Sequence, residues 1–244
     1  MKFGTVNNIQ LLSTRPVGTA LVEAAAAFGI VLDERAFIET KPIVSDDVVR
    51  AVAERLQQQA TVAFTSMNAV EAVAALKKDR QPHWTIYSVG SNTSRLAAAY
   101  FGAEQMAGTA SSAAALAEQI IRSGNTSAIV FFCGNQRLDE LPDLLRSQGI
   151  RVDEIVVYET LQRQQRVTTD YDGILFFSPS AVHSFFSTNN PQEGTVFFAI
   201  GSTTAAAIGK YTHHKVVVSM EPGKENLVKE AIAYFSKMKT DNPK

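Results

Sequence analysis

Short apolar runs alternate with alanine- and leucine-rich stretches along most of the chain. Within each run the apolar residues follow one another, which is typical of strands buried on both faces of a parallel sheet. The strands predicted in this way are 9–13, 61–65, 85–89, 128–132, 173–177, 195–200 and 215–219. The helices predicted between and after them are 19–28, 46–59, 68–78, 93–101, 112–122, 138–148, 181–187, 203–211 and 224–236. The pattern predicts an α/β fold with parallel sheets covered by helices on both faces, a doubly wound arrangement.

The chain also repeats itself. Residues 29–40 read GIVLDERAFIET and residues 149–160 read GIRVDEIVVYET, aligned without a gap. Two further pairs of similar segments are 64–70 with 176–182, and 87–100 with 198–211. A repeat of this length is too long for a solenoid unit, so it predicts two similar lobes.

The end of the longest repeat looks different from the rest of the chain. The pattern predicts extended segments at residues 35–41 and 155–161, and each leads into polar or proline-containing sequence. Because a proline or a polar run interrupts regular structure, we interpret these segments as connectors between the lobes.

Charge and composition narrow the function classes. The formal net charge is −1, so the chain has no field that attracts nucleic acid or an anionic membrane, and an anionic ligand must be held by local groups. The single cysteine, Cys133, excludes an internal disulfide and favours a reducing compartment. Residues 1–10 do not resemble a signal peptide, and no apolar stretch approaches the length of a membrane span. We therefore expect a cytoplasmic protein without membrane contact.

Candidate binding residues follow the predicted strands. In parallel α/β sheets, ligands bind beyond the carboxyl ends of the strands, where the N–H groups of helix N-termini point outward. Hydroxyl, amide and guanidinium side chains occupy these places: Arg15, Ser66, Asn68, Thr93, Ser178, Ser180, Thr203 and Thr204. Each hydroxyl or amide alone could simply cap a helix, and Arg15 could simply be solvated. Taken together, they favour a cleft for a large ligand with several carboxylates or phosphates.

Tyr158 is the position where the second copy of the repeat departs from the first, which has Ile38. The shared strand geometry therefore does not require a phenol at this position. Tyrosine is common in strands as a packing residue, which is one interpretation. The other is a proton donor beside the cleft, since a phenol stays protonated at neutral pH.

Several familiar motifs are missing from the sequence. It contains neither the GxGxxG and GxxxxGK[ST] phosphate loops nor the GxSxG nucleophile elbow. The histidines are scattered along the chain, and the adjacent pair His213 and His214 lacks the spacing of a helical metal site. We predict no metal site.

Segments along essentially the whole chain carry a family resemblance: LLSTRP (11–16), AFTSMNAVEAV (63–73), SVGSNTSRLAAAYFG (88–102), GIRVDEIVVYET (149–160), ILFFSPSAVHSFF (174–186) and AIGSTTAAAI (199–208). In their order and spacing they resemble the uroporphyrinogen-III synthase family. Met67 departs from the family, in which proline is frequent at this position. Pro16, Val17 and Gly18 also replace the more polar residues often found after the arginine.

The resemblance implies two α/β lobes joined by a two-stranded antiparallel ladder. It also implies a chain that crosses between them: residues 1–35 and 162–244 form lobe 1, residues 42–154 form lobe 2, and 36–41 and 155–161 are the connector strands.

The implied reaction closes the linear tetrapyrrole hydroxymethylbilane, which bears eight carboxylates, with loss of water and inversion of the last ring. No metal or cofactor takes part. The family's tyrosine corresponds to Tyr158 as the catalytic candidate. Its hydroxyl-bearing turns correspond to the binding positions Ser66, Thr93, Ser178, Ser180, Thr203 and Thr204. A transient contact with the preceding enzyme of the pathway is left open.

Two other interpretations compete with an enzyme. A non-catalytic module with the same cleft would bind a tetrapyrrole or another anion without changing the isomer ratio of the product. A flavodoxin-like flavin protein would show the same sheet pattern.

Overall fold

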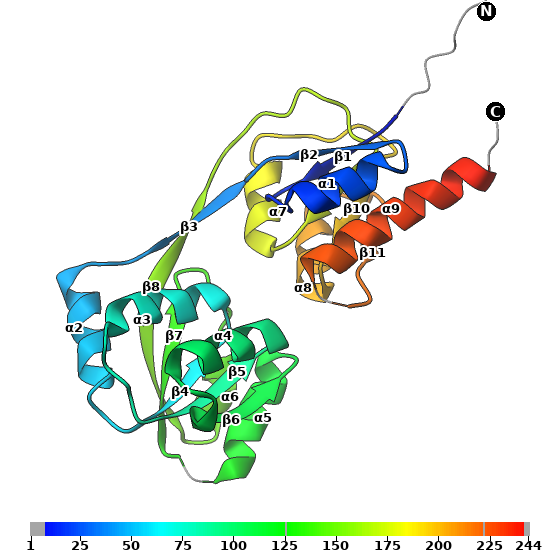
Figure 1. Ribbon diagram of the computed structural model, residues 1–244. Coiled ribbons are helices and arrows are strands. Elements are labelled where there is room, and N and C mark those ends of the chain that lie inside the picture. The colour runs from blue at the N-terminus through cyan, green and yellow to red at the C-terminus, as the bar shows by residue number, and fades with distance from the viewer. Residues whose placement is uncertain (1–7, 125, 222, 242–244) are drawn as a thin grey trace, which may run out of the picture. The chain divides into compact units, whose positions relative to one another are not determined.

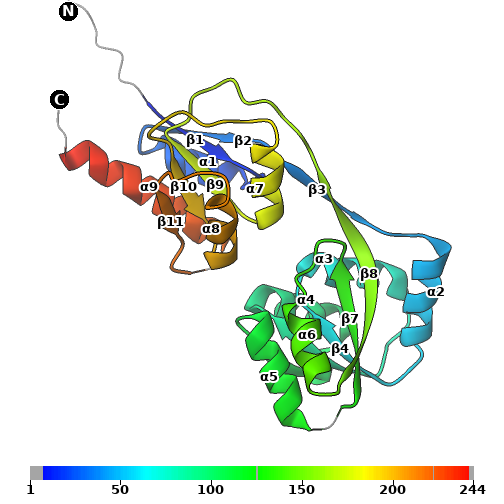
Figure 2. The same cartoon turned by 180° about the vertical axis from the view of Figure 1, so that it is seen from behind.

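The computed structural model describes residues 8–124, 126–221 and 223–241, and the chain divides into two compact units (Figures 1 and 2). Unit 1 contains the residues up to Glu39 and those from Leu161 onward, and unit 2 contains Thr40–Thr160. The chain therefore leaves unit 1, completes unit 2, and returns to unit 1.

Unit 1 is built on a five-stranded parallel sheet. Its strands, in spatial order, are β11 (Val216–Val218), β10 (Val196–Ala199), β9 (Gly173–Phe176), β1 (Ile9–Ser13) and β2 (Ile30–Glu34). Its helices are α1 (Thr19–Ala26), α7 (Pro179–Phe186), α8 (Ser202–Ile208) and α9 (Lys224–Asp241).

Consecutive residues of the unit 1 strands point to opposite faces. On one face, Leu11 and Phe198 pack with α1 and α9, and on the other, Leu12 and Phe197 pack with α7 and α8. Each of these four side chains is fully buried. Because both faces are covered, the strands need apolar residues at successive positions, which explains their continuous apolar runs.

Unit 2 is built on a six-stranded sheet. Its strands, in spatial order, are β3 (Ile38–Pro42), β8 (Arg151–Gln162), β7 (Ala128–Gly134), β4 (Ala60–Phe64), β5 (Trp84–Val89) and β6 (Met106–Ala110). The helices are α2 (Asp46–Arg55), α3 (Met67–Lys77), α4 (Ser91–Phe101), α5 (Ala113–Ser123) and α6 (Glu140–Ser147), with a 3₁₀ turn at Ala103–Gln105.

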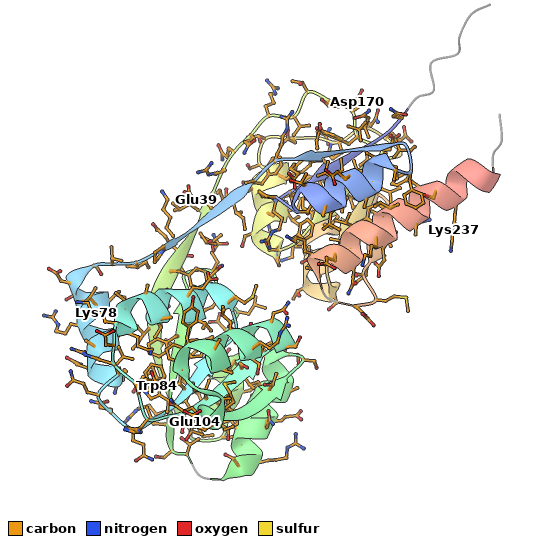
Figure 3. The ribbon with its side chains drawn as sticks, in the orientation of Figure 1. Glu39, Lys78, Trp84, Glu104, Asp170 and Lys237 are labelled. Carbon is orange, nitrogen blue, oxygen red and sulfur yellow. The ribbon has the colours of Figure 1, made fainter. Side chains whose placement is uncertain are left out.

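The unit 2 core is also divided by its sheet. Helices α2, α3 and α4 pack on one face, and α5 and α6 pack on the other. The only tryptophan, Trp84, lies in the first of these layers against Phe101 and Phe132, and its indole N–H donates to the carbonyl of Arg55 at 3.0 Å (Figure 3). The aromatic packing and this hydrogen bond fix the indole in the interior.

Strand β3 lies beside β8 at the edge of the unit 2 sheet. The N–H of Ile43 donates to the carbonyl of Val157 at 2.9 Å, and the N–H of Arg163 donates to the carbonyl of Phe37 at 2.8 Å. Residue numbers therefore increase along β3 while they decrease along the facing β8, so the two strands are antiparallel. The remaining pairs of this sheet are parallel.

The structure confirms the predicted α/β class with parallel sheets, and every predicted helix is present with ends shifted by a few residues. The strand prediction was incomplete, because β2, β6 and the first half of β8 were missed. Strands β2 and β6 lie at sheet edges, where burial alternates along the strand and no continuous apolar run is needed.

Candidate functional site

In unit 1, the predicted binding residues lie at one edge of the sheet. Arg15 follows β1, Ser178 and Ser180 follow β9, and Thr203 and Thr204 follow β10. Because β1, β9 and β10 are adjacent parallel strands, their carboxyl ends lie together. The topology therefore brings these five residues to the edge where α/β proteins bind ligands.

Arg15 is exposed, and its guanidinium carbon lies 5.8 Å from the centroid of the Phe177 ring. This cation–π contact joins the turn after β1 to the residue before Ser178. The guanidinium is therefore placed beside the neighbouring turn.

The hydroxyl-bearing residues of unit 1 have two different roles. Ser178 is the N-cap of α7, and its Oγ accepts a hydrogen bond from the N–H of Ala181 at 3.2 Å. Thr203 and Thr204 cannot cap α8, because Gly201 holds that position and the threonines lie inside the first turn. Thr203 is exposed, whereas Thr204 is 2% exposed. Capping therefore explains Ser178 and leaves the two threonines unexplained.

Unit 2 shows the same division between capping serines and first-turn threonines. Ser66 follows β4 and caps α3, because its Oγ accepts from the N–H of Asn68 at 3.1 Å. Thr93 follows β5 and lies in the first turn of α4, behind an N-cap glycine, Gly90, with φ 81°. Strands β7, β4 and β5 are adjacent and parallel, so these turns share one edge with the end of β7.

Tyr158 lies in β8 next to the end of β7. The register between these strands shifts at Cys133 and Gly134, so that Gly134 pairs with Tyr158. The Tyr158 side chain is half-buried and packs against the core layer formed with α2, α3 and α4. Packing therefore accounts for part of its environment, as one of the two sequence interpretations predicted.

The phenol also lines a pocket of about 190 Å³. The pocket combines polar groups with small apolar side chains, and its lining residues are Thr40, Lys41, Pro42, Asn68, Glu71, Ala72, Ala75 and Tyr158. All of them belong to unit 2. Two of the predicted site residues, Asn68 and Tyr158, are thus brought together around one space.

Elsewhere in β8, Glu154 forms ion pairs with Arg137 and with Arg146 of α6. Burial raises the pKa of this carboxyl, but hydrogen bonds from Arg137 and Arg146, together with their charges, lower it more, so the net shift is downward. Burial, reinforced by the charge of Glu154 and opposed by that of Arg137, raises the pKa of the Cys133 thiol to about 11. Cys133 is therefore a buried thiol that stays neutral at pH 7.

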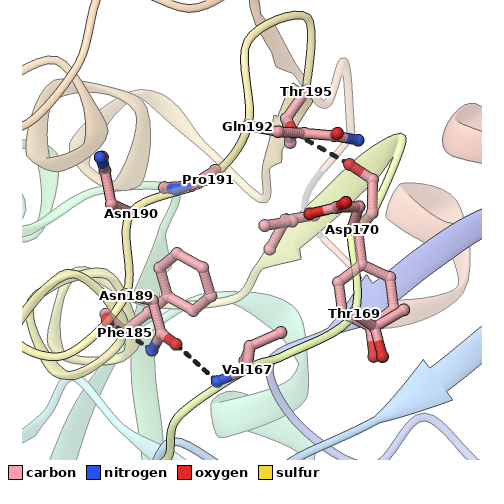
Figure 4. Close-up of a pocket in the computed structure, with 11 residues that line it drawn as sticks. Val167, Thr169, Asp170, Phe185, Asn189, Asn190, Pro191, Gln192 and Thr195 are labelled. Atoms are coloured by element: carbon pink, nitrogen blue, oxygen red, sulfur yellow. Dashed lines mark hydrogen bonds between the residues drawn. The ribbon is translucent and has the colours of Figure 1, made fainter.

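A second pocket, of about 50 Å³, lies in unit 1 (Figure 4). It is formed by the segments that lead into β9 and β10, so it lies at the amino ends of these strands and contains none of the predicted site residues. The Asn189 side chain closes it by accepting from the N–H of Val167 at 2.7 Å and donating to the carbonyl of Phe185 at 2.8 Å. These bonds indicate a structural joint between two loops.

Among the residues that sequence reasoning missed are the polar ones of the pocket wall, Thr40, Lys41 and Glu71, and Gly134 beside the phenol. Lys41 and Glu71 are charged residues of a surface strand and helix, and nothing in their sequence context distinguishes them from solvated charges. Thr40 ends a repeat, and Gly134 has no side chain that would mark it as a site residue in the sequence.

Within the described ranges, no group of three or more His, Cys, Asp or Glu side chains is arranged to hold a metal ion. None of the helices in the described ranges is long and apolar enough to cross a membrane.

Comparison with known proteins places these features in a family context. The family model described as uroporphyrinogen-III synthase HemD matches residues 19–229. The range includes every candidate site residue except Arg15.

Solved structures show the same fold at low sequence identity. The uroporphyrinogen-III synthetase of Helicobacter pylori is 14% identical with a TM-score of 0.66, and the alignment covers 93% of this chain and 99% of that chain. A mutant uroporphyrinogen III synthase of Thermus thermophilus is 15% identical with a TM-score of 0.64, covering 94% and 99%. A wild-type form of the Thermus protein is 16% identical with a TM-score of 0.53, at the same coverage.

Proposed function

Because the chain belongs to the uroporphyrinogen-III synthase family, we propose that it closes hydroxymethylbilane into uroporphyrinogen III, with loss of water and inversion of ring D. The observation that carries this proposal is the family match over residues 19–229. We further propose a lyase that needs neither metal nor cofactor and acts in the cytosol in porphyrin biosynthesis. The family match disfavours the flavodoxin-like alternative.

Binding of the substrate is assigned to the carboxyl edges of the two sheets. Hydroxymethylbilane bears eight carboxylates, and the chain has a net charge of −1, so attraction must come from local donors. We assign these donors to Arg15, to the hydroxyl and amide residues of the strand-end turns, and to the backbone N–H groups of the first helical turns. Residues 36–41 and 155–161 act in this proposal as the connectors between the two lobes.

The chemistry requires the terminal hydroxyl of the substrate to leave as water. Protonation of that hydroxyl and cleavage of the carbon–oxygen bond give an azafulvene cation and one water molecule. The substituted α-carbon of ring D attacks this cation to form a spiro intermediate. The bond from that carbon to the methylene bridge of ring C then breaks and gives a second azafulvene cation. The free α-carbon of ring D attacks this cation and loses a proton, which closes the macrocycle with ring D inverted. We assign to Tyr158 the hydrogen bond to the departing oxygen, since a neutral phenol can donate it.

Most of the rate enhancement in this scheme comes from holding the two ends of a flexible chain together. Effective molarities for well-oriented groups reach about 10⁵–10⁸ M, so positioning alone can supply a large share of the barrier reduction. This fits a site that offers many donors and one phenol.

The test is an assay with freshly prepared hydroxymethylbilane that separates the III and I isomers of the product. The parent protein is expected to direct closure to the III isomer, and an unchanged isomer ratio despite binding would indicate the non-catalytic module. Tyr158→Phe removes only the hydroxyl and is expected to lower kcat about 10²–10⁴-fold.

Tyr171→Phe is the matched control for this substitution. Its phenol donates to Asp33 at 2.6 Å inside unit 1, and burial, with this bond, raises its pKa to about 12. The control is expected to reduce stability and leave kcat unchanged. Activity of Tyr158→Phe within a factor of two of the parent would assign Tyr158 to packing.

A further inference from the structure

The end of β7 leaves a space that the Tyr158 ring fills. A Cβ atom built on Gly134 would lie 2.4 Å from Cζ of Tyr158, 2.6 Å from Cε2 and 2.7 Å from the phenol oxygen. Real side chains do not approach so closely, so no residue larger than glycine fits beside the ring where it lies.

Backbone conformation is not the reason for glycine at this position. Gly134 does not have a positive φ, so another residue could adopt its backbone angles. The requirement comes from the space that the phenol occupies. This distinguishes Gly134 from Gly90, whose φ of 81° favours glycine although a Cβ there would meet nothing within 4 Å.

The backbone around Tyr158 is held independently of its ring. The N–H of Asn135 donates to the carbonyl of Tyr158 at 3.1 Å, and the Asn135 side-chain oxygen accepts from the N–H of Thr160 at 2.8 Å. The Gln136 side chain donates to the carbonyl of Thr160 at 3.1 Å. These bonds fix the strand, whereas the direction of the ring depends on what lies beside it.

We propose that Gly134 is a positioning residue for Tyr158: by lacking a side chain, it lets the phenol lie against the end of β7 and holds its hydroxyl at the pocket shared with Asn68. A larger residue would displace the ring, which is the movable partner, and would leave the hydrogen-bonded strand in place. The catalytic consequence rests on the proposed function, whereas the displacement of the ring does not.

The kinetic test is a double-mutant cycle of Gly134→Ala, Tyr158→Phe and the double variant. Gly134→Ala is expected to lower kcat by about the same 10²–10⁴-fold as Tyr158→Phe, and the double variant is expected to be no slower than Tyr158→Phe alone. Gly209→Ala is the matched control, because a Cβ there meets only backbone carbonyl oxygens at 3.7 Å. A kcat of Gly134→Ala within threefold of the parent, or independent losses in the double variant, would overturn the proposal.

A direct readout separates this inference from the proposed function. In protein labelled with 3-fluorotyrosine, the fluorine resonance that disappears in Tyr158→Phe belongs to Tyr158, one of six tyrosines. It is expected to shift by more than its linewidth in Gly134→Ala and to stay in place in Gly209→Ala. A resonance that does not move in Gly134→Ala refutes the positioning role, whether or not the parent forms the III isomer.

If Gly134→Ala does not fold, Tyr158→Ala provides the background for the test. Removing the ring removes the clash, so Gly134→Ala/Tyr158→Ala is expected to melt at the same temperature as Tyr158→Ala. A clearly lower Tm for the double variant would show that Gly134 is needed for another reason and would overturn the proposal.

Discussion

The contrast between Ser66 and Thr93 gives a prediction that separates helix capping from ligand binding. Both follow strands of unit 2, and both were predicted as binding residues. Ser66 caps α3 through its Oγ, whereas Thr93 lies behind a glycine N-cap and is 6% exposed. We therefore expect Ser66→Ala to reduce stability and Thr93→Val to reduce activity without reducing stability.

The magnitudes follow from the groups removed. Loss of a serine N-cap costs about 0.5–2 kcal/mol of stability. Thr93→Val keeps the buried methyl group and the β-branched shape, and threonine and valine have similar helix propensities, so its effect on stability is expected within about 0.5 kcal/mol. Loss of one hydrogen bond to the substrate costs about 0.5–1.5 kcal/mol, and about 3 if the acceptor is a carboxylate. These values correspond to about 2- to 13-fold in kcat/KM, and about 160-fold at the upper limit.

Two measurements on each variant decide the prediction. The fluorescence of Trp84 follows urea unfolding of unit 2, which contains both substituted residues. The isomer assay gives kcat/KM for hydroxymethylbilane. A Thr93→Val protein with parental kcat/KM and lowered stability would show that the hydroxyl is structural and would remove Thr93 from the site. Thr204→Val in unit 1 repeats the kcat/KM measurement, because Thr204 is the repeat-equivalent residue, and circular dichroism follows its unfolding because Trp84 reports unit 2.

Two further predictions concern stability. Glu154→Gln is expected to cost about 1–3 kcal/mol at pH 7, because Arg137 and Arg146 lose their carboxylate partner. A carboxyl whose pKa is lowered in the folded state contributes stability above its unfolded pKa and loses it as pH falls through the folded pKa. The free energies of unfolding of parent and variant should therefore converge in acid. A difference between them that persists in urea titrations from about pH 6 to about pH 2 would contradict this. Ser184→Ala is expected to raise stability by up to about 1 kcal/mol, because the Ser184 hydroxyl is fully buried and lacks a hydrogen-bond partner among the described residues. Ser219→Ala, which loses a 2.8 Å bond to the carbonyl of Glu221, is the control and should lower the midpoint of thermal unfolding.

The sequence allowed prediction of those strands whose burial is complete. In β4, β7 and β9 the central residues are buried on both faces, which requires the continuous apolar run that was recognised. Strand β6 reads MAGTA, with half-buried and exposed residues in alternation, and it pairs with a neighbour on one side only. Its position depends on β5, which is a tertiary contact that local pattern does not encode.

The first half of β8 was missed for a related reason. Its residues Arg151, Asp153 and Glu154 are charged, and two of them form ion pairs with other elements of unit 2. The charges interrupt the apolar run by which the other strands were recognised, and their partners Arg55 and Arg146 lie on other elements. These ion pairs with helices α2 and α6 offset the cost of placing charges in a partly buried strand, and a search for apolar periodicity does not detect them.

The family resemblance is confirmed by the family match, and the assignment of individual residues to the site remains a prediction. Sequence alone placed the hydroxyl residues correctly at strand ends, because turns after buried strands can be located from the apolar runs. It could not separate Ser178, which caps a helix, from Thr204, which does not. That distinction depends on a one- or two-residue difference in where each helix begins, which is the least certain feature of sequence-based prediction.

The two copies of the repeat differ at the position of the phenol. At the offset of 120 residues that aligns 29–40 with 149–160, Tyr158 corresponds to Ile38. At the end of β7, Gly134 has no side chain, and the ring of Tyr158 lies in the space that a side chain would need. Because a side chain at position 134 would exclude this ring, the glycine and the tyrosine form one arrangement, and a phenol at position 158 requires both residues.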